Sequence, residues 1–392
     1  MFGKQDRLLN IYSKPTNNMH VLIAALHRPI KPTGVCRHAA NLANCLAEIP
    51  EITQISLVIG VWQQDYFTTA FTFVSQKIKL ITVNIKNSSL VRNSWFLWGL
   101  PRLTNKLKPA IVHLSFPLPV LKAKFNIPVL TTIHDLYPYE CPENFGFPQV
   151  WFNRLFLKQC INNSDGLSCV SQVTLERLKF YFPRLKPQQK ITVIYNYVDF
   201  DINSIEPLPP RQLLKNNSFL LTVAQHRQNK NLDLLLEAYA KMLENRQLDH
   251  NCQLIIVGSS GPQTENLQHL ITQLALKNKV LLLSAIKDEE LCWLYQNCHA
   301  FIIPSSTEGF CLPLVEALHF SDRIVCSDIP IFKEVGNVNC TYFSLENDPI
   351  NNLSNAIIQT IDKPQASYLM NVSKFNKLNI AHQYFNLYSQ IK

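Results

Sequence analysis

No C-x-x-C pair occurs among the 11 cysteines of this 392-residue sequence, and several cysteines lie in apolar runs such as "GLSCVS" and "RIVCSD". This pattern favours buried, reduced thiols over a disulfide framework. No apolar run approaches the roughly 18 residues that span a bilayer. The first stretch, "MFGKQDRLLNIYSKPTNN", lacks the apolar core of a signal peptide. We therefore expect a cytoplasmic protein that at most contacts the inner face of a membrane.

The charged residues give a net charge of +9, from 37 Lys and Arg against 28 Asp and Glu. Such a balance favours anionic partners, which include nucleotides, anionic lipid surfaces and nucleic acid. Charge alone does not choose among them, and an ordinary basic surface explains it equally well. The hydrophobic content of 47% is sufficient for a sizeable core, and the length suits two domains.

Short apolar runs of buried-strand type, such as "HVLIAAL", "AIVHLS", "FLLTVA" and "AFIIPS", alternate with helical patterns. Strands separated by helices imply right-handed crossovers and a parallel sheet. A Pro- and Asn-rich stretch near 203–217 divides the alternation into two sets. The sequence therefore predicts an α/β fold of two doubly wound, Rossmann-like domains that face each other across a cleft. Ligands of such domains bind beyond the carboxyl ends of the strands, so we expect the site in that cleft.

The same pattern gives the domain limits. We expect five segments: a polar extension at 1–18, an N-terminal domain at 19–205, a linker at 206–217, a C-terminal domain at 218–370, and a helix at 371–392 that packs back towards the N-terminal domain.

The stretch "SSTEGFCLPLVEAL", from Ser305 to Leu318, holds two carboxylates eight positions apart. Glu308 lies on a loop, and we expect Glu316 in the first turn of the following helix. Carboxylates accept hydrogen bonds from sugar hydroxyls, so one can bind a ribose and the other a hexose. The alternative is that Glu316 complements the helix dipole and Glu308 is a solvated loop residue.

The helix after this loop is expected to begin near Leu312, with Pro313 at its first position, where the missing N–H has no helical partner. Gly309 allows the loop to turn and a ligand to approach its backbone. Free N–H groups around Cys311, Leu312 and Leu314 would then form an anion site strengthened by the helix dipole.

The stretch "EGFCLPLVEA" resembles the E-x7-E motif of retaining GT-B glycosyltransferases of the family-4, "group 1" type. Other blocks of that family follow in the expected order, and the resemblance covers the chain from about residue 19. These blocks are "PTGVCRHAANLANCL", "TTIHDLYPYECPENF", "CVSQVTLERL", "VIYNYVD", "VAQHRQNKNLDLLLEAYA" and "SDIPIFKEVGNVNCTYF". The second resembles the HD-L-x-P block of a mannosyltransferase-like subgroup.

The resemblance implies roles for individual residues. It implies that Glu316 binds the ribose, that Glu308 contacts the donor sugar as a catalytic residue, and that Lys230 and Arg227 neutralise the diphosphate. His134 is implied to lie near the donor sugar on the reacting face. The remaining implied donor-binding residues are Gly34, Gly309, Phe310, Cys311 and Leu312.

The resemblance further implies a hexosyl transfer that needs no metal and no cofactor, because the nucleotide sugar is a substrate. It implies UDP-hexose as donor, with GDP-mannose next, and a glycan or lipid-linked acceptor in polysaccharide or glycoconjugate synthesis. The chain departs from the family where Ala224-Gln225 replace Gly-Arg and where Cys311 replaces a glycine. Whether Arg227 replaces the arginine missing at Gln225 stays open.

Three other interpretations remain. The first is a non-catalytic protein of the same fold that binds nucleotide sugars or glycans. The second is peripheral contact with an anionic membrane through "RNSWFLWGLPRLTNKLK", which mixes Trp and Phe with Arg and Lys as interfacial helices do and equally fits a packing helix. The third, nucleic-acid binding, rests on charge alone and is not expected.

Overall fold

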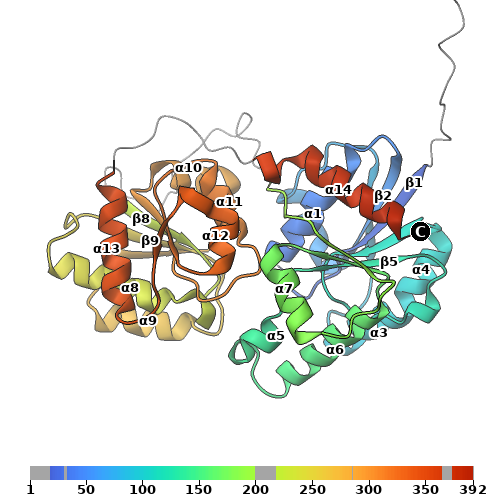
Figure 1. Cartoon of the computed structure of the whole chain (residues 1–392), viewed down its shortest axis with the longest axis horizontal. Helices are drawn as coiled ribbons and strands as arrows, with labels where there is room; N and C mark the ends of the chain where they lie inside the picture. The colour runs from blue at the N-terminus through green and yellow to red at the C-terminus, as the bar shows by residue number, and fades with distance from the viewer. Residues whose placement is uncertain (1–17, 31–32, 199–217, 285, 364–372, 392) are drawn as a thin grey trace, which may run out of the picture.

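The computed structural model describes residues 18–30, 33–198, 218–284, 286–363 and 373–391. The expected extension up to residue 17 and the expected linker at 206–217 lie outside the described residues. The described chain contains two parallel sheets, each covered by helices on both faces (Figure 1).

The first sheet has seven strands in the order β3-β2-β1-β4-β5-β6-β7, and every neighbouring pair is parallel. Its inner strands are buried on both faces, which explains why they appear in the sequence as continuous apolar runs. The strands are β1 (Met19–Ala24), β2 (Ile52–Gly60), β3 (Ile78–Val83), β4 (Ile111–Leu114), β5 (Val129–Ile133), β6 (Gly166–Cys169) and β7 (Lys190–Val193).

Helices cover both faces of this sheet. One core joins the sheet to α1 (Gly34–Ala47), α2 (Gln64–Thr69) and the last helix of the chain, α14 (Lys377–Gln390). The other face packs against the remaining segments of the domain: α3 (Ser89–Ser94), a π-helical turn η2 (Trp95–Gly99), α4 (Leu100–Leu107), α5 (Tyr137–Glu140), α6 (Gln149–Asn163) and α7 (Gln172–Tyr181).

The second sheet has six parallel strands in the order β10-β9-β8-β11-β12-β13. They are β8 (Phe219–Val223), β9 (Gln253–Val257), β10 (Val280–Leu283), β11 (Ala300–Ile303), β12 (Ile324–Ser327) and β13 (Thr341–Phe343). One core contains α8 (Leu232–Glu244), α9 (Thr264–Gln273) and α13 (Pro349–Ile361). The opposite core contains α10 (Asp288–Asn297), α11 (Leu312–Leu318) and α12 (Pro330–Gly336).

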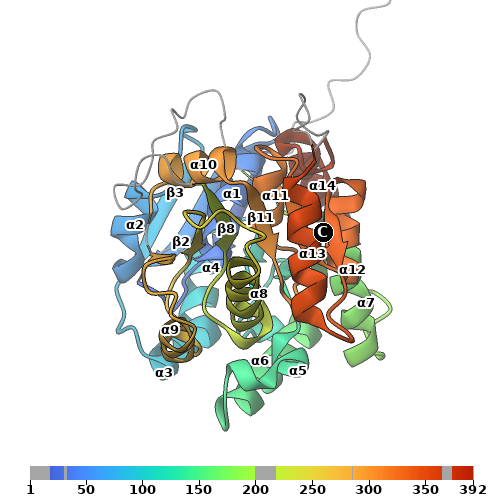
Figure 2. The same ribbon diagram turned by 90° about the vertical axis from the view of Figure 1, so that its left-hand side faces the viewer.

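The predicted fold class is confirmed: the chain forms two Rossmann-like domains of parallel strands and covering helices (Figure 2). In each sheet the strand order reverses direction at one point, between β1 and β4 in the first sheet and between β8 and β11 in the second. Loops at the carboxyl ends of strands beside such a point form the usual ligand site of this architecture. The α14 helix lies against the first domain, where Tyr388 Oη and His113 Nδ1 are 2.7 Å apart.

All 11 cysteines lie in the described part of the chain and none forms a disulfide; nine of them are buried. None of the described helices combines the length and the apolar character that crossing a membrane requires.

Candidate active site

Side chains from both domains meet where the loops that follow β5, β8 and β11 come together. Tyr137, just after β5, contacts Glu308, which follows β11. Asn144 Nδ2 donates to Asn229 Oδ1 at 3.1 Å, which joins the first domain to the loop after β8. The predicted catalytic and phosphate-binding residues therefore lie at the interface between the domains.

Glu308 is the centre of this interface. Its side chain is buried, and Lys230 Nζ lies 2.5 Å from Oε1. Ser305 donates to the same oxygen at 2.9 Å, whereas Tyr137 Oη donates to Oε2 at 3.0 Å from the opposite domain. The solvated-loop alternative is therefore wrong, because a buried carboxylate with three donors is fixed in position.

Tyr137 and Ser305 are not among the residues predicted to act in the site. Tyr137 follows His134 by three residues within the quoted "TTIHDLYPYE" block, and Ser305 begins the quoted "SSTEGF" stretch. Proximity to these blocks was therefore the available signal, but no local pattern says that a tyrosine reaches a carboxylate about 170 residues later.

Lys230 and Arg227 belong to the loop that leads from β8 into a short 3₁₀ turn, η5 (Gln228–Lys230). Lys230 points at Glu308, whereas Arg227 Nε donates to Gln225 Oε1 at 2.8 Å. The guanidinium of Arg227 is thus bound to the residue at the position of the missing family arginine. Its role towards phosphate stays a prediction.

Glu316 occupies the second turn of α11, because that helix begins at Leu312. The expected first-turn position was wrong by about one residue, and no acidic side chain lies in the first turn of α11, which weakens the argument that Glu316 complements the helix dipole. The side chain is buried, and Tyr295 Oη donates to Oε2 at 2.8 Å. Burial raises the pKa of Glu316, and the nearby charge of Arg37 opposes this effect.

An ion pair connects the domains beside Glu316. Arg37 Nη2 on α1 lies 2.8 Å from Asp288 Oδ1 on α10, and Nη1 donates to Oδ2 at 3.3 Å. Burial alone would lower the pKa of Arg37, but the charge of Asp288 raises it overall. The guanidinium is therefore held charged near the carboxylate predicted to bind ribose. Arg37 lies in the quoted "PTGVCRHAANLANCL" block, to whose arginine no role was assigned.

His134 follows β5 and is half-buried. Its Nε2 lies 2.8 Å from the Ser115 carbonyl oxygen, which can only accept, so this nitrogen carries the proton and Nδ1 does not. Burial lowers the pKa of His134 to about 4. The ring is therefore neutral near pH 7, with Nδ1 available as an acceptor. The ring of His38 packs edge-to-face on it, with centroids 4.6 Å apart.

The predicted anion site at the start of α11 needs correction. Pro313 occupies the second helical position, and Leu314 N donates to the Cys311 carbonyl at 3.1 Å, so this N–H is not free. The helix has only seven residues, and its dipole acts mainly within its terminal turns. Cationic side chains are therefore better placed than this helix to neutralise a diphosphate.

The other predicted donor-binding residues differ in their surroundings. Phe310 lies in the hydrophobic core, where it contacts the rings of Tyr195 and Phe375. Its side chain therefore anchors the loop to the core and does not face the ligand. Leu312 is half-buried, and a Cβ on Gly34 would lie 3.8 Å from its Cδ1. The start of α1 therefore faces the start of α11 across the domain boundary.

A further cross-domain contact holds helix α7. Glu334 on α12 accepts from Gln172 N at 2.6 Å and from Val173 N at 3.0 Å, and so caps the first turn of a helix in the other domain. Glu334 and the start of α7 lie in the quoted "SDIPIFKEVGNVNCTYF" and "CVSQVTLERL" blocks, so both were visible in the sequence without their pairing.

Metal ligands are not grouped in the described part of the chain: there, no three His, Cys, Asp or Glu residues are placed to hold an ion. One D-x-D pattern, at Asp199 and Asp201, lies a few residues beyond β7 and outside the described residues. The expectation of a metal-free site stays a prediction.

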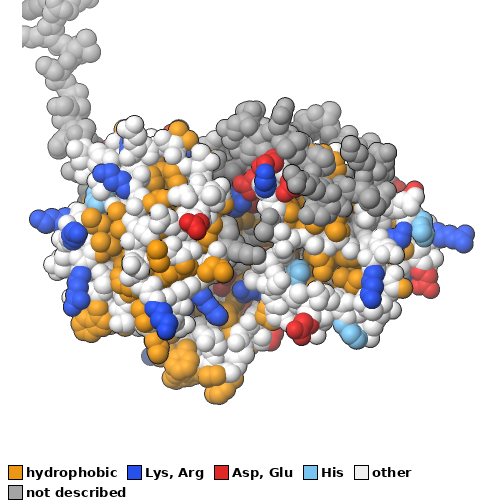
Figure 3. Space-filling view, turned by 180° about the vertical axis from the view of Figure 1, so that it is seen from behind, with side chains coloured by type: hydrophobic (Ala, Val, Ile, Leu, Met, Phe, Trp, Pro, Cys, Tyr) orange, Lys and Arg blue, Asp and Glu red, His pale blue; other side chains and the backbone are white. Residues whose placement is uncertain are grey.

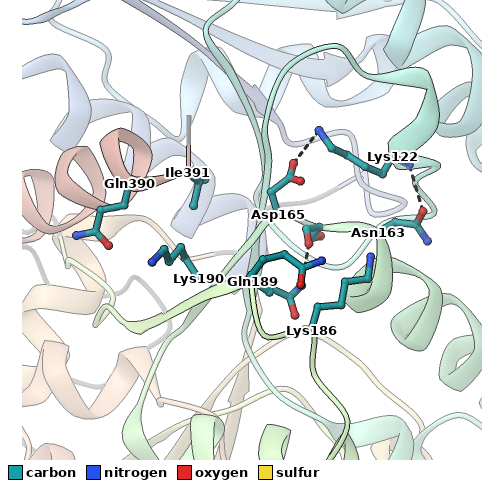
Figure 4. Close-up of a pocket in the computed structure, with 10 residues that line it drawn as sticks. Lys122, Asn163, Asp165, Lys186, Gln189, Lys190, Gln390 and Ile391 are labelled. Carbon is teal, nitrogen blue, oxygen red and sulfur yellow. Dashed lines mark hydrogen bonds and ion pairs between the residues drawn. The ribbon is translucent and has the colours of Figure 1, made fainter.

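One pocket lies away from this interface, at the amino ends of β6 and β7 (Figure 4). Lys122 Nζ lies 2.8 Å from Asp165 Oδ2 in it, and Lys186 and Lys190 also line it. Ligands of doubly wound domains bind at the opposite, carboxyl ends of the strands, so this pocket is not the candidate active site.

Two family models match consecutive parts of the chain. "Glycosyltransferase Family 4" matches residues 32–202, and "Glycosyl transferases group 1" matches residues 206–376. The chain belongs to the GT-B glycosyltransferases of the family-4 type. It is therefore an enzyme of the glycosyltransferase class.

Individual proteins agree with this membership. The chain is 25% identical to "O-antigen chain mannosyltransferase RfbU" of Salmonella typhimurium over 91% of its own length and 93% of that protein. Among solved structures, sucrose-phosphate synthase from Thermosynechococcus elongatus has a TM-score of 0.69 at 16% identity, covering 95% of this chain and 99% of that one. Anabaena HepE, solved with UDP and glucose, has a TM-score of 0.65 at 18% identity with the same coverage. The two structures support the fold alone.

Proposed function

We propose that this glycosyltransferase moves a mannosyl group from a nucleoside diphosphate sugar to a hydroxyl of a glycan or lipid-linked glycan, in the assembly of a polysaccharide. The observation that carries the proposal is the position of Glu308. This buried carboxylate joins Lys230 of one domain to Tyr137 of the other where the strand ends of both sheets converge.

The choice of mannose differs from the sequence expectation, which favoured UDP-hexose ahead of GDP-mannose. The relative that aligns over nine-tenths of the chain is named a mannosyltransferase, and this favours GDP-mannose as the donor. UDP-glucose, a UDP-hexose of the kind that the sequence resemblance implied, is the second candidate. The comparisons give no support to the non-catalytic alternative.

In the proposed reaction the bond between the sugar C1 and the β-phosphate oxygen breaks, and the nucleoside diphosphate leaves with the electron pair. The acceptor hydroxyl oxygen forms the new bond to C1 on the same face, and its proton passes to an oxygen of the departing phosphate. Such a front-face path retains the anomeric configuration. A covalent intermediate would require a side chain that bonds to C1. Among the described residues, we identify no side chain in this role.

Charge neutralisation is the main contribution expected of the protein. Lys230 and Arg227 lie on one loop and would face the departing diphosphate in this scheme, because fixed cations stabilise charge that develops in a transition state. Glu308 would accept hydrogen bonds from hydroxyls of the donor sugar. The Lys230 ammonium has three N–H donors, so it would donate to Glu308 and to the phosphate at the same time.

His134 supplies a neutral acceptor. With its proton fixed on Nε2 by Ser115, Nδ1 can accept from a sugar hydroxyl or from the acceptor. Glu316 and Arg37 would bind the ribose and orient the nucleotide. No metal or cofactor is required by this scheme, and EDTA is expected to leave turnover unchanged.

The test is a thermal-shift screen of UDP, GDP and ADP, followed by their sugars. A ligand at about 100 times its Kd adds about 2.7 kcal/mol to the free energy of unfolding. GDP and GDP-mannose are expected to give the largest shifts, and NMR of the product is expected to show retained configuration. A larger shift with UDP-glucose would reassign the donor, and an inverted product would overturn the front-face mechanism.

A further inference from the structure

The start of α7 belongs to the first domain in the chain, yet it packs on the second domain. We call residues 170–174 the α7 start. Val170 is fully buried in a hydrophobic core whose other members lie mainly in the second domain, and Val173 packs against the same core. Figures 1 and 2 both show α7 beside α12, a helix of the second domain. The apolar side chains of the α7 start therefore hold the two domains together.

Two groups of the second domain bind the polar atoms of the α7 start. The Gly309 carbonyl accepts from the hydroxyl groups of Ser171 and Thr174, at 2.7 and 3.0 Å. Each oxygen of the Glu334 carboxylate accepts one backbone N–H, at 2.6 Å from the first residue of α7 and at 3.0 Å from the second. With the two valines, all five residues of the α7 start contact the second domain.

The Glu334 contact requires a carboxylate. The first N–H groups of a helix have no partner within the helix, and the helix dipole favours an anion beside them. The hydroxyl of Ser171 accepts from Thr174 N at 2.9 Å, and Glu334 accepts the two N–H groups that precede it. A glutamine would supply only one acceptor oxygen, because its amide nitrogen is a donor. This capping therefore depends on the charge of Glu334 and on the two domains being together.

Glu334 also lies beside the segments that join the domains. The chain passes between them after β7 and again before α14. Lys374, in the short turn η7 (Ser373–Phe375), donates from Nζ to the Glu334 carbonyl oxygen at 2.6 Å and lies 5.7 Å from the centre of the Tyr195 ring. Burial and the charge of Glu334 raise the pKa of Tyr195, which follows β7, to about 12. Glu334 therefore contacts both passages of the chain as well as α7.

The α7 start lies one strand away from the proposed reacting groups. Ile133 of β5 is paired with Cys169 of β6, so His134 and the α7 start leave the same edge of the sheet. The loop that carries Glu308 lies between them, because Gly309 lies against the His134 carbonyl and accepts from the α7 start. A shift of the α7 start away from α12 would therefore move His134 relative to Glu308.

A separate ion pair, between Arg37 on α1 and Asp288 on α10, also joins the domains. Charged side chains of both signs lie near the domain boundary on the face that Figure 3 shows. The side chains of this pair are 22% and 35% exposed, and solvent weakens such pairs. Glu334 instead binds backbone N–H groups that a helix holds in place. It therefore fixes the relative position of the domains more closely than the ion pair does.

We propose that Glu334 is a positioning residue for the transfer reaction. By capping α7 from the other domain, it holds the α7 start against the loop of Glu308 and so sets the separation between Glu308 and His134. This role rests on the proposed function, because it takes these two residues to act on the donor sugar, and it applies to whichever sugar is transferred. The alternative role of Glu334 is to stabilise the fold alone.

The variant Gln172→Pro removes one N–H of the contact and leaves the helix able to form. Proline is favoured at the first helical position, and Ser171 before it already has the extended backbone that a following proline requires, with φ −158° and ψ 163°. We expect kcat to fall at least about tenfold, because small displacements of reacting groups are costly in rate. The Kd of the nucleoside diphosphate should not change, because Lys230 and Glu316 both lie in the second domain.

Gln172→Ala is the matched control. It removes the same side chain, including its hydrogen bond to Glu176, but keeps the N–H that Glu334 accepts. Its kcat should equal that of the wild type. A loss of kcat in the proline variant alone would therefore come from the contact between the domains and not from the glutamine side chain.

Glu334→Gln tests the same contact from the other domain and should lower kcat by a similar factor. Glu176→Gln, at an exposed carboxylate of α7, is its control. Because both changes break one contact, Glu334→Gln/Gln172→Pro should lose little more kcat than the more affected single variant. Hydrogen exchange needs no donor: the peptide 305–312 should exchange at least about tenfold faster in both variants and at the wild-type rate in both controls.

Wild-type kcat or unchanged exchange of the 305–312 peptide in the two variants would overturn the proposal. Nucleotide affinity that falls as much as kcat would overturn it as well, because the contact would then support the fold alone. Additive losses in the double variant would show two unrelated effects. Turnover is measured with whichever donor the thermal-shift screen identifies. A donor other than GDP-mannose would therefore change the proposed function and leave the role of Glu334 intact.

Discussion

Gly309 packs directly against the backbone of His134: a Cβ built on Gly309 would lie 1.7 Å from the His134 carbonyl oxygen. The two residues belong to opposite domains, so this contact brings the loop after β11 against the end of β5. On the same loop, the Gly309 carbonyl accepts from Ser171 Oγ at 2.7 Å and from Thr174 Oγ1 at 3.0 Å. Any side chain at Gly309 would therefore force the domains apart.

The substitution Gly309→Ala is expected to lower kcat at least about tenfold, since small displacements of reacting groups are costly in rate. Binding of the nucleoside diphosphate should change much less, because Lys230 and Glu316 lie on the C-terminal domain alone. Turnover and nucleotide Kd should be measured in parallel. Gly146→Ala is the control: its φ of +69° makes a Cβ costly for stability, but nothing lies within 4 Å of that Cβ, so kcat should not change. Wild-type kcat in Gly309→Ala would mean that the closed contact is not part of the working enzyme.

Lys230→Ala is expected to weaken the nucleoside diphosphate by roughly 10- to 150-fold, the value of a charge-assisted hydrogen bond of about 1.5–3 kcal/mol. The bare nucleoside should lose little, because it has no phosphate for the ammonium to contact. Lys287→Ala, at a more exposed cation of the same domain, serves as control. Equal losses for nucleoside and diphosphate would remove Lys230 from the phosphate site and leave it as the partner of Glu308 only.

The parts of the fold that the sequence predicted are those governed by local pattern. Parallel strands buried on both faces appear as apolar runs, so β8 and β11 were recognised, and the loops after them hold Lys230 and Glu308. The β13 strand was not recognised, because three residues give no periodicity. The α13 helix was not recognised either, since its apolar positions are separated by asparagines.

The sequence could predict only those site residues that a motif in their own loop identifies. Tyr137 donates to Glu308 from the other domain, and no spacing in the sequence contains that contact. The same holds for Arg37 with Asp288, which are 251 positions apart. Such pairs depend on how two separately folded sheets meet, which is a property of packing and not of local pattern.

Cys311 adopts a left-handed backbone, with φ 71° and ψ 78°, at the start of α11. Left-handed conformation costs a residue with a Cβ about 1–2 kcal/mol, and glycine avoids this cost. Cys311→Gly is therefore expected to be more stable than Cys311→Ala by about 1 kcal/mol in urea unfolding. Cys292, inside α10, is the control, because alanine should there be the more stable by a similar amount. Higher stability of Cys311→Ala would show that this loop relaxes on substitution.

Buried histidines make stability depend on pH. Burial lowers the pKa of His27 to about 4, of His113 to about 3 and of His134 to about 4, from the ordinary value of 6.5. Between about pH 6.5 and 4 the unfolded chain therefore binds protons that the folded chain does not. Asp135 acts in the opposite sense, because burial raises its pKa to about 6 and the folded state holds its proton first. Burial also lowers the pKa of His20, His38, His226 and His299 and raises the pKa of Glu316. Seven groups against two therefore give a net loss of stability as pH falls.

The free energy of unfolding is thus expected to decrease from pH 6.5 towards pH 5. The slope is up to about 1.4 kcal/mol per pH unit for each histidine by which the lowered histidines outnumber the raised carboxyl groups. His113→Gln should reduce this slope by one such increment even if it lowers stability at pH 7, because glutamine takes up no proton in the unfolded chain. His269→Gln, at an exposed histidine of α9, is the control and should reproduce the wild-type slope. Urea midpoints at pH 5.0, 5.5, 6.0, 6.5 and 7.0 measure all three proteins. Parallel curves for wild type and His113→Gln would show that His113 takes up its proton equally in both states, which its burial between Tyr388 and Thr132 argues against.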